Sequence, residues 1–83
     1  MLSVALVDFH DAMELMLDTA NAKDAVKTMD LFGKVNVKLQ AIEAEANDVE
    51  IQAIRSNLDA LHALAKEGKT AALPAQADKL KTS

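Results

Sequence analysis

A regular spacing of apolar residues between Asn47 and Gly68 constrains the fold more than any other feature of the sequence. The apolar positions follow one another in steps of three, four, three and four residues, and they are Ile51, Ile54, Leu58, Leu61 and Ala65. This spacing places them along one face of an α-helix. Asn47 followed by Glu50 is typical of a helix start, and Gly68 of a helix end. We therefore predict a helix over 48–67 with an apolar stripe that packs against other helices.

The first twenty residues contain a second apolar stripe of the same kind. Its members recur in steps of four, three, four, three and four residues, and they are Leu2, Leu6, Phe9, Met13, Met16 and Ala20. We predict a helix over 3–20, with Ser3 as its N-cap. The other side of this helix is acidic, and its carboxylates belong to Asp8, Asp11, Glu14 and Asp18.

Three apolar residues, Val4, Val7 and Leu15, interrupt the acidic side of this first helix. One interpretation is a wide buried face, or a few exposed apolar residues of the kind that most proteins have. The other is that a partner, or another copy of the chain, covers a second side of the helix. Mixed apolar and acidic side chains are common at interfaces. The candidate binding residues are therefore Val4, Val7, Asp8, Asp11 and Leu15.

The next segment predicts a second helix over 22–46. Asn21 followed by Asp24 is typical of a helix start, so we expect the helix to begin at Ala22. Its apolar positions are Val26, Met29, Phe32, Val35, Leu39, Ile42 and Ala46. Its lysines fall on one stripe, at Lys23, Lys27, Lys34 and Lys38. This stripe is either a solvated face that attracts the acidic first helix or a surface that steers an acidic partner.

Gly33 lies in the middle of the second predicted helix, where glycine costs about 1 kcal/mol relative to alanine. The residues from Lys34 to Leu39 also alternate between polar and apolar, as a β-strand does. We exclude a strand because no second strand is present to satisfy its backbone hydrogen bonds. The alternative to a straight helix is a helix bent near Gly33.

The C-terminal segment predicts a short fourth helix over 73–81. Pro74 suits the first turn of a helix, because its missing N–H costs little there. Leu73, Ala77 and Leu80 form a stripe of two turns. A helix of this length does not cover the other three. The bundle is therefore either open at one end or completed by another chain.

Two charged clusters accompany the third helix. Its flank carries residues that we interpret as a solvated ion-pair edge, namely Arg55, Asp59, His62 and Lys66. The junction that precedes it is the most acidic part of the chain and contains Glu43, Glu45, Asp48 and Glu50.

The composition agrees with a helical bundle. The 83 residues suffice for a single domain, 1–83, with a core of marginal size. Hydrophobic residues make up 51% of the chain and aromatic residues 2%, and there is no cysteine. An aliphatic core must therefore stabilise the fold without disulfides. Together with the four amphipathic segments, this predicts an all-α, antiparallel up-and-down helical bundle of three long helices and a short C-terminal one.

Composition also argues against several functions. A net charge of −4 and the scarcity of aromatic residues do not suit nucleic-acid binding. No run of about twenty apolar residues suits a membrane span, so we expect no membrane partner. No basic segment precedes an apolar run, as it does in a signal peptide. With Met1 as the natural start, we expect a cytoplasmic protein.

Side chains for catalysis or metal binding are sparse. The sequence has no cysteine nucleophile, no Gly-rich phosphate loop and no Ser–His–acid motif, so we predict that the protein is not an enzyme. His10 with Glu14, and Asp59 with His62, stand one helical turn apart. The two Glu-x-x-His elements of metal-binding bundles are absent, however. We predict neither a metal nor a cofactor.

Three stretches resemble the soluble b-type cytochrome four-helix bundles of the bacterial periplasm: ALHALAKEGK at 60–69, ADKLKT at 77–82 and AKDAVKTM at 22–29. The resemblance covers about half of the chain and implies an up-and-down bundle with short loops. That family holds haem with a methionine near the start of its first helix and a histidine late in its fourth. Here the early position falls near Val7, and no histidine follows His62. We expect the fold to carry over and the haem site not to.

The sequence favours a small non-enzymatic interaction module, an adaptor, inhibitor or regulator. We expect it to bind another protein, or itself as a homodimer, through the candidate residues on the first helix. The alternative is a carrier of haem or another cofactor, of the b-type cytochrome kind. In that alternative Met13 or Met16 acts as a ligand together with His10 or His62.

Overall fold

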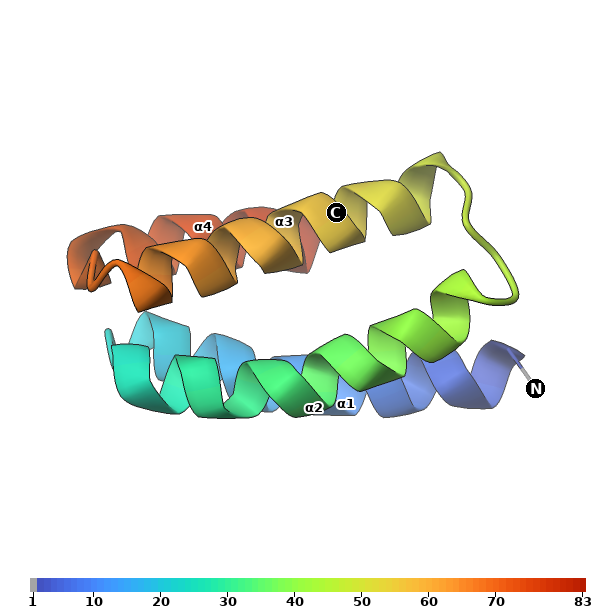
Figure 1. Ribbon diagram of the computed structural model, residues 1–83, viewed down its shortest axis with the longest axis horizontal. Coiled ribbons are helices and arrows are strands. Elements are labelled where there is room, and N and C mark those ends of the chain that lie inside the picture. Colours follow the sequence, from blue (N-terminus) through green and yellow to red (C-terminus); the bar gives the residue numbers. More distant parts are fainter. Residues whose placement is uncertain (1) are drawn as a thin grey trace.

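The structure is a computed structural model that describes the backbone of residues 2–83 and the side chains of residues 4–83. Over these residues it has four α-helices, a short 3-10 turn and no strand. They are α1 (Leu2–Asn21), α2 (Ala25–Glu43), α3 (Val49–Lys66), η1 (Thr70–Ala72) and α4 (Leu73–Thr82). The helices pack as an antiparallel bundle (Figure 1), which confirms the predicted all-α fold.

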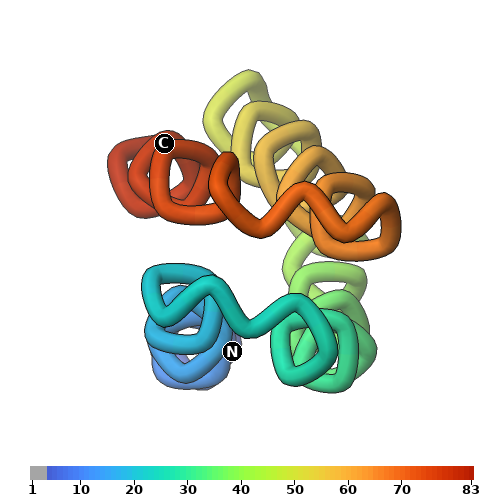
Figure 2. The backbone as a smooth tube through the Cα atoms, turned by 90° about the vertical axis from the view of Figure 1, so that its left-hand side faces the viewer, coloured from blue at the N-terminus to red at the C-terminus, as the bar shows by residue number. Residues whose placement is uncertain are grey.

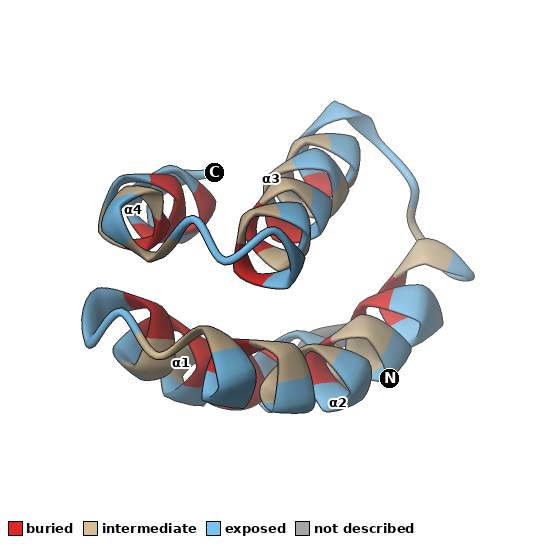
Figure 3. Cartoon of the chain, turned by 60° about the vertical axis from the view of Figure 1, so that its left-hand side comes forward, coloured by how far each residue is buried: buried red, intermediate tan, exposed pale blue. Residues whose placement is uncertain are grey.

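The helices form two hairpins that lie one above the other (Figure 2). α1 lies beside α2 in one hairpin, and α3 lies beside α4 in the other. The core fills the space between the hairpins. Its buried hydrophobic residues are Phe9, Ala12, Met13, Met16, Leu17, Ala20, Val35, Leu39, Ile42, Ile51, Leu58, Leu61, Ala65, Leu73, Ala77 and Leu80. Most of each predicted apolar stripe therefore points inward (Figure 3).

Among residues 4–83, two members of the predicted stripes are exposed, and four others, Met29, Phe32, Ala46 and Ile54, are only partly buried. Leu6 is 39% exposed and Val26 is 64% exposed. The buried side of α2 runs through Thr28, Val35, Leu39 and Ile42, and that spacing leaves Val26 on another side of the helix. Its assignment to the apolar stripe was wrong. The side chains of Leu2 and Ser3, which we placed in the first stripe and at its N-cap, lie outside the described side chains.

Thr28 takes the buried position in the first part of α2. Its hydroxyl lies 2.9 Å from that of Thr19 on α1, and it also donates to the carbonyl of Asp24 at 2.8 Å. The Thr19 hydroxyl in turn lies 2.7 Å from the carbonyl of Met16. A buried hydroxyl without a partner is unfavourable, so this contact favours one register of α1 against α2.

The structure places the caps of α2 and α3 on aspartates that the sequence analysis did not select as caps. The N–H of Lys27 donates to the Asp24 carboxylate at 3.1 Å, and that of Ile51 donates to the Asp48 carboxylate at 3.0 Å. Asn21 instead ends α1, because the chain needs residues 22–24 to reverse direction before α2 can begin. The predictions of Asn21 and Asn47 as caps, and of a helix start at Ala22, were wrong.

The two hairpin turns close in the same way, with different residues. Gly68 has φ +70° after α3, as its position predicted, and Lys23 has φ 59° after α1. The next residue in each turn donates its backbone N–H to the carbonyl five residues earlier. Lys69 donates to Leu64 and Asp24 donates to Thr19, both at 2.9 Å. The left-handed backbone conformation costs a residue other than glycine roughly 1–2 kcal/mol. The first turn therefore holds strain that the second does not.

α2 is one uninterrupted helix through Gly33 and ends at Glu43 rather than at residue 46. The rejection of a strand over 34–39 is confirmed. Residues 44–48 then link the two hairpins. Because this link leads from one hairpin to the other, it has to cross the end of the bundle (Figure 1).

α4 has 10 residues and α1 has 20, so α4 covers only part of α1. Ala77, Asp78 and Lys81 of α4 face a stretch of α1 that begins at Glu14. Against α3, Gln76 donates from its amide nitrogen to the carbonyl of Asn57 at 3.0 Å. The other end of α1, where Leu6 lies, extends beyond α4, as the length of the predicted fourth helix implied.

We expect Gly33→Ala to stabilise the protein by about 0.5–1 kcal/mol, because alanine restricts the unfolded chain and suits a helix interior. A Cβ added at Gly33 meets no atom within 4 Å. Urea and thermal unfolding followed by circular dichroism measure the change.

Gly68→Ala is the matched control for this substitution. Its added Cβ also meets nothing within 4 Å, but its φ of +70° is unfavourable for alanine. It should therefore destabilise the protein. A Gly33→Ala protein that is no more stable than the original would contradict an unstrained helix at this position.

Candidate interaction surface

All five candidate residues lie on the exposed side of α1. Val4 is 58% exposed, Val7 is 59% and Leu15 is 57%, and Asp8 and Asp11 are exposed as well. The interpretation of a wide buried face is therefore wrong for these valines and this leucine. They are large aliphatic side chains in water, within reach of another molecule.

Four of the five residues share one face of α1. Val4, Asp8, Asp11 and Leu15 follow in steps of four, three and four residues, so they line up along the helix. Val7 lies at the edge of this face, on the side turned away from α2. The stripe is therefore apolar at its two ends and acidic in its middle.

The lysine stripe of α2 adjoins this face. Asp8 and Ala5 of α1 line a shallow hollow together with Val37, Lys38 and Ala41 of α2. Lys34 and Lys27 lie about one and three helical turns further along the same side of α2, and both are exposed. Lys23, the first member of the predicted stripe, lies in the turn before α2. The two helices thus present one continuous surface, acidic along α1 and basic along α2.

We call this surface the outer face, because it lies on the side of the α1–α2 hairpin that faces away from α3 and α4 (Figures 2 and 3). Its residues are Val4, Asp8, Asp11 and Leu15 of α1 and Lys27, Lys34, Val37, Lys38 and Ala41 of α2.

The charges of the outer face remain solvated in the isolated chain. Among residues 4–83, ion pairs within 4.0 Å join His10 to Glu14, Arg55 to Glu43 and Asp59, and Lys69 to Glu67. None of these pairs connects α1 to α2. The acidic and basic helices are antiparallel neighbours, as one interpretation of the lysine stripe required, but their carboxylates and ammonium groups are not in contact.

Arg55 of α3 forms the main polar connection to α2. Its guanidinium donates two hydrogen bonds to the Glu43 carboxylate, at 3.0 and 2.8 Å, and one to the Asn36 side chain at 2.6 Å. It also reaches Asp59 on its own helix at 3.1 Å. The side chains of Arg55 and Glu43 are only 22% and 24% exposed. The hydrogen bonds from Arg55, together with its charge, hold the pKa of Glu43 below its ordinary value, against an opposing effect of burial.

The interpretation of the α3 flank as a solvated ion-pair edge was therefore wrong for Arg55. The sequence does contain a signal for this contact. Glu43 and Arg55 lie at similar distances on either side of residue 48, and residues placed in this way face each other when two consecutive helices are antiparallel. The prediction placed Glu43 in the acidic junction and Arg55 on the flank of the third helix, and did not pair them.

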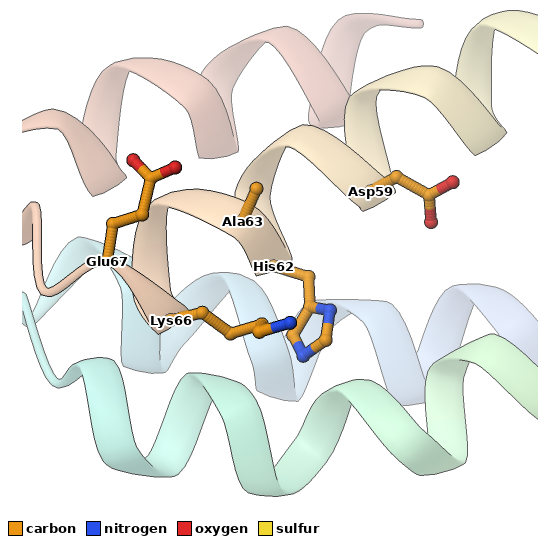
Figure 4. Close-up of a pocket in the computed structure, with 5 residues that line it drawn as sticks. All are labelled: Asp59, His62, Ala63, Lys66 and Glu67. Atoms are coloured by element: carbon orange, nitrogen blue, oxygen red, sulfur yellow. The ribbon is translucent and has the colours of Figure 1, made fainter.

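His62 belongs to the same side of α3 and contacts α2 through its ring. It stacks on Phe32 with ring centroids 3.7 Å apart and an interplanar angle of 0°. Burial and, secondarily, the nearby charge of Lys66 lower the pKa of His62, while Asp59 acts in the opposite direction. A surface hollow beside the ring is lined by Asp59, His62, Ala63, Lys66 and Glu67 (Figure 4), and in that view the Lys66 side chain extends toward the imidazole.

The structure does not gather the candidate metal or haem ligands. His10 pairs with Glu14 at 3.5 Å on the exposed side of α1, and Asp59 and His62 lie on α3. Residues 2–83 contain no group of three or more His, Asp or Glu side chains arranged to hold a metal ion. Met13 and Met16 are buried core residues, and Met16 has no exposed surface.

Three comparisons of the chain with known proteins found no match. No protein-family model matches it, and no curated protein or solved structure matches it either. These comparisons do not bear on the resemblance to the b-type cytochrome bundles. In the part of the chain that the structure describes, no helix is long and apolar enough to cross a bilayer.

We expect Arg55→Lys to destabilise the protein by about 1–2 kcal/mol, because lysine keeps the charge but loses the two-pronged contact with Glu43. The pKa of Glu43 lies below 4.5 in the folded protein. The contribution of the pair is therefore present above pH 4.5 and fades as the pH falls through the lowered pKa.

Asp59→Asn is the control for the Arg55 substitution. It removes the exposed partner of Arg55 and should change the free energy of unfolding by less than about 0.5 kcal/mol. Urea unfolding at neutral and acidic pH measures both effects. Equal losses from the two substitutions would rule out a dominant role for Glu43.

His62 should make the protein less stable as the pH falls below its ordinary pKa of 6.5. Because its pKa is lowered in the folded state, the unfolded chain binds the proton first, so protonation favours unfolding. His62→Phe retains a ring against Phe32 without a titrating group. The difference in unfolding free energy between pH 7.5 and pH 5.5 should be smaller in this variant than in the original protein.

Proposed function

We propose that the protein is a non-enzymatic protein–protein interaction module that binds its partner through the exposed side of α1. The observation that carries this proposal is the group of three large aliphatic side chains, each more than half exposed, among the carboxylates of one helix. Burying apolar surface of this kind on binding is favourable by roughly 25 cal/mol per Å². An adaptor, inhibitor or regulator is the functional class that such a module suits.

The side chains of this surface indicate which kind of partner it can bind. Val4 and Leu15 require apolar side chains opposite them, while Asp8 and Asp11 require basic groups. A helix with lysines or arginines beside an apolar stripe meets both requirements. Such opposite charges raise the rate of encounter and select among partners more than they raise affinity.

The haem-carrier alternative gains no support from the position of its ligands. Met13 and Met16 fill the core, and neither of them lines the hollow beside His62 or the hollows beside α1. Methionines at core positions commonly act as packing residues. We therefore propose the interaction module in preference to the haem carrier.

Site-specific photo-crosslinking in cells of the source organism tests the proposal. A benzophenone amino acid at position 15 should form a discrete adduct with a protein, and mass spectrometry identifies that protein. The same group at Ser56, exposed on α3, is the control and should not form this adduct.

A second variant connects the adduct to the acidic stripe. With the crosslinker at position 15, Asp8→Lys together with Asp11→Lys should abolish the adduct. Both aspartates are exposed, so circular dichroism should show an unchanged fold. Equal labelling from positions 15 and 56, or an adduct indifferent to the two charge reversals, would refute binding through α1.

A further inference from the structure

The outer face has an acidic half on α1 and a basic half on α2, and the two halves are complementary in charge. Its α1 half has the acidic and apolar groups, and its α2 half has Lys27, Lys34 and Lys38 with Val37 and Ala41. The α2 half therefore has the composition required of a partner for α1. Within one chain the two halves lie side by side and no ion pair joins α1 to α2 among residues 4–83. A second copy of the chain can bring them face to face.

The charges of the two halves lie at matching heights along the bundle. Asp8 and Lys38 line the same hollow, so they lie at about the same height along the long axis of the bundle. From there Asp11 is three residues along α1 and Lys34 is four residues along α2 in the same direction, since the helices are antiparallel. At about 1.5 Å per residue, the two differ in height by only about 1.5 Å.

The same agreement holds further along the hairpin. Asp18 is ten residues from Asp8, and Lys27 is eleven residues from Lys38. The hydroxyl contact between Thr19 and Thr28 independently fixes this end of the register, at 2.9 Å. An acidic group and a lysine therefore share a level at three places along the bundle. Asp30 is the acidic exception on the exposed side of α2.

Two symmetric ways of stacking the outer face on itself can be compared. A two-fold axis across the helices lays α1 on α1 and α2 on α2, which sets like charges against each other. A two-fold axis along the helices lays α1 of each copy on α2 of the other and keeps every residue at its own height. Only the second arrangement brings each aspartate opposite the lysine of the same level.

We propose that the occupant of the outer face is a second copy of this chain, related by a two-fold axis that runs along α1 and α2. This inference rests on the proposed function and names its partner. In the dimer Asp11 of each copy faces Lys34 of the other, and Val4, Leu15, Val37 and Ala41 lie along the shared groove. The bundle measures 36 × 20 × 18 Å, so its broadest side is only about the size of the roughly 800 Å² per partner of a typical specific interface, and the contact takes up most of that side.

Charge reversal across the proposed contact tests this arrangement. Sedimentation velocity of the purified full chain, from micromolar to millimolar concentration, should show a monomer–dimer equilibrium that weakens at high salt. Asp11→Lys and Lys34→Asp should each weaken dimerisation about tenfold or more, because each places two like-charged pairs in the dimer. Mixing the two variants should restore the dimer, since both cross-pairs are then of opposite charge.

The controls separate charge effects at the contact from general ones. Glu50→Lys and Lys66→Asp change the same charges at exposed positions on α3 and should leave dimerisation unchanged. Leu15→Lys should weaken it without rescue by mixing. Circular dichroism confirms that each variant is folded. A wild-type monomer at every concentration, single variants that still dimerise, or a mixture of variants that stays monomeric would overturn the proposal.

Failure of the dimer is distinguishable from failure of the proposed function. A monomer whose position-15 crosslink captures a different protein refutes the second copy and keeps the interaction module. A position-15 crosslink between two copies, absent at position 56, supports both.

Discussion

The contact between two aliphatic helical surfaces is the interaction on which the whole structure depends. The chain has no disulfide and almost no aromatic core, so leucine, isoleucine, valine, methionine and alanine side chains must fill the space between the α1–α2 and α3–α4 hairpins. Thr28, Gln76 and Arg55 add polar contacts between the helices, and no buried side-chain nitrogen or oxygen among the described residues lacks a hydrogen-bond partner. The inner surfaces are thereby fully committed to folding, and only the outward surfaces remain for function.

Periodicity predicted the helices and most of the core because burial on one side of a helix imposes its spacing directly on the sequence. Boundaries were predicted less well. Asn21 and Asn47 have the chemistry of a cap, but the space needed to reverse the chain assigned the caps to Asp24 and Asp48. Arg55 was misjudged for a related reason: its partner Glu43 lies on another helix, and a single polar contact between two helices leaves no periodic signal.

For the candidate surface, the sequence predicted the mixed composition of α1 and the lysine stripe of α2 as possible neighbours, but not that they form one continuous surface. Their levels depend on the register of α1 against α2, to which the contact between Thr19 and Thr28 contributes. Thr28 is not a member of the predicted apolar stripe, and its sequence position gives no sign that it will be buried. A surface formed by two elements can therefore be recognised only after their packing is known.

The link over residues 44–48 has a consequence for how the protein folds. Each hairpin closes through a short turn, so most contacts within it join residues that are near in sequence, a property associated with folding in microseconds to milliseconds. The link over residues 44–48 and the Arg55–Glu43 contact join the two hairpins. Amide hydrogen exchange should then resolve two cooperative units, one for each hairpin.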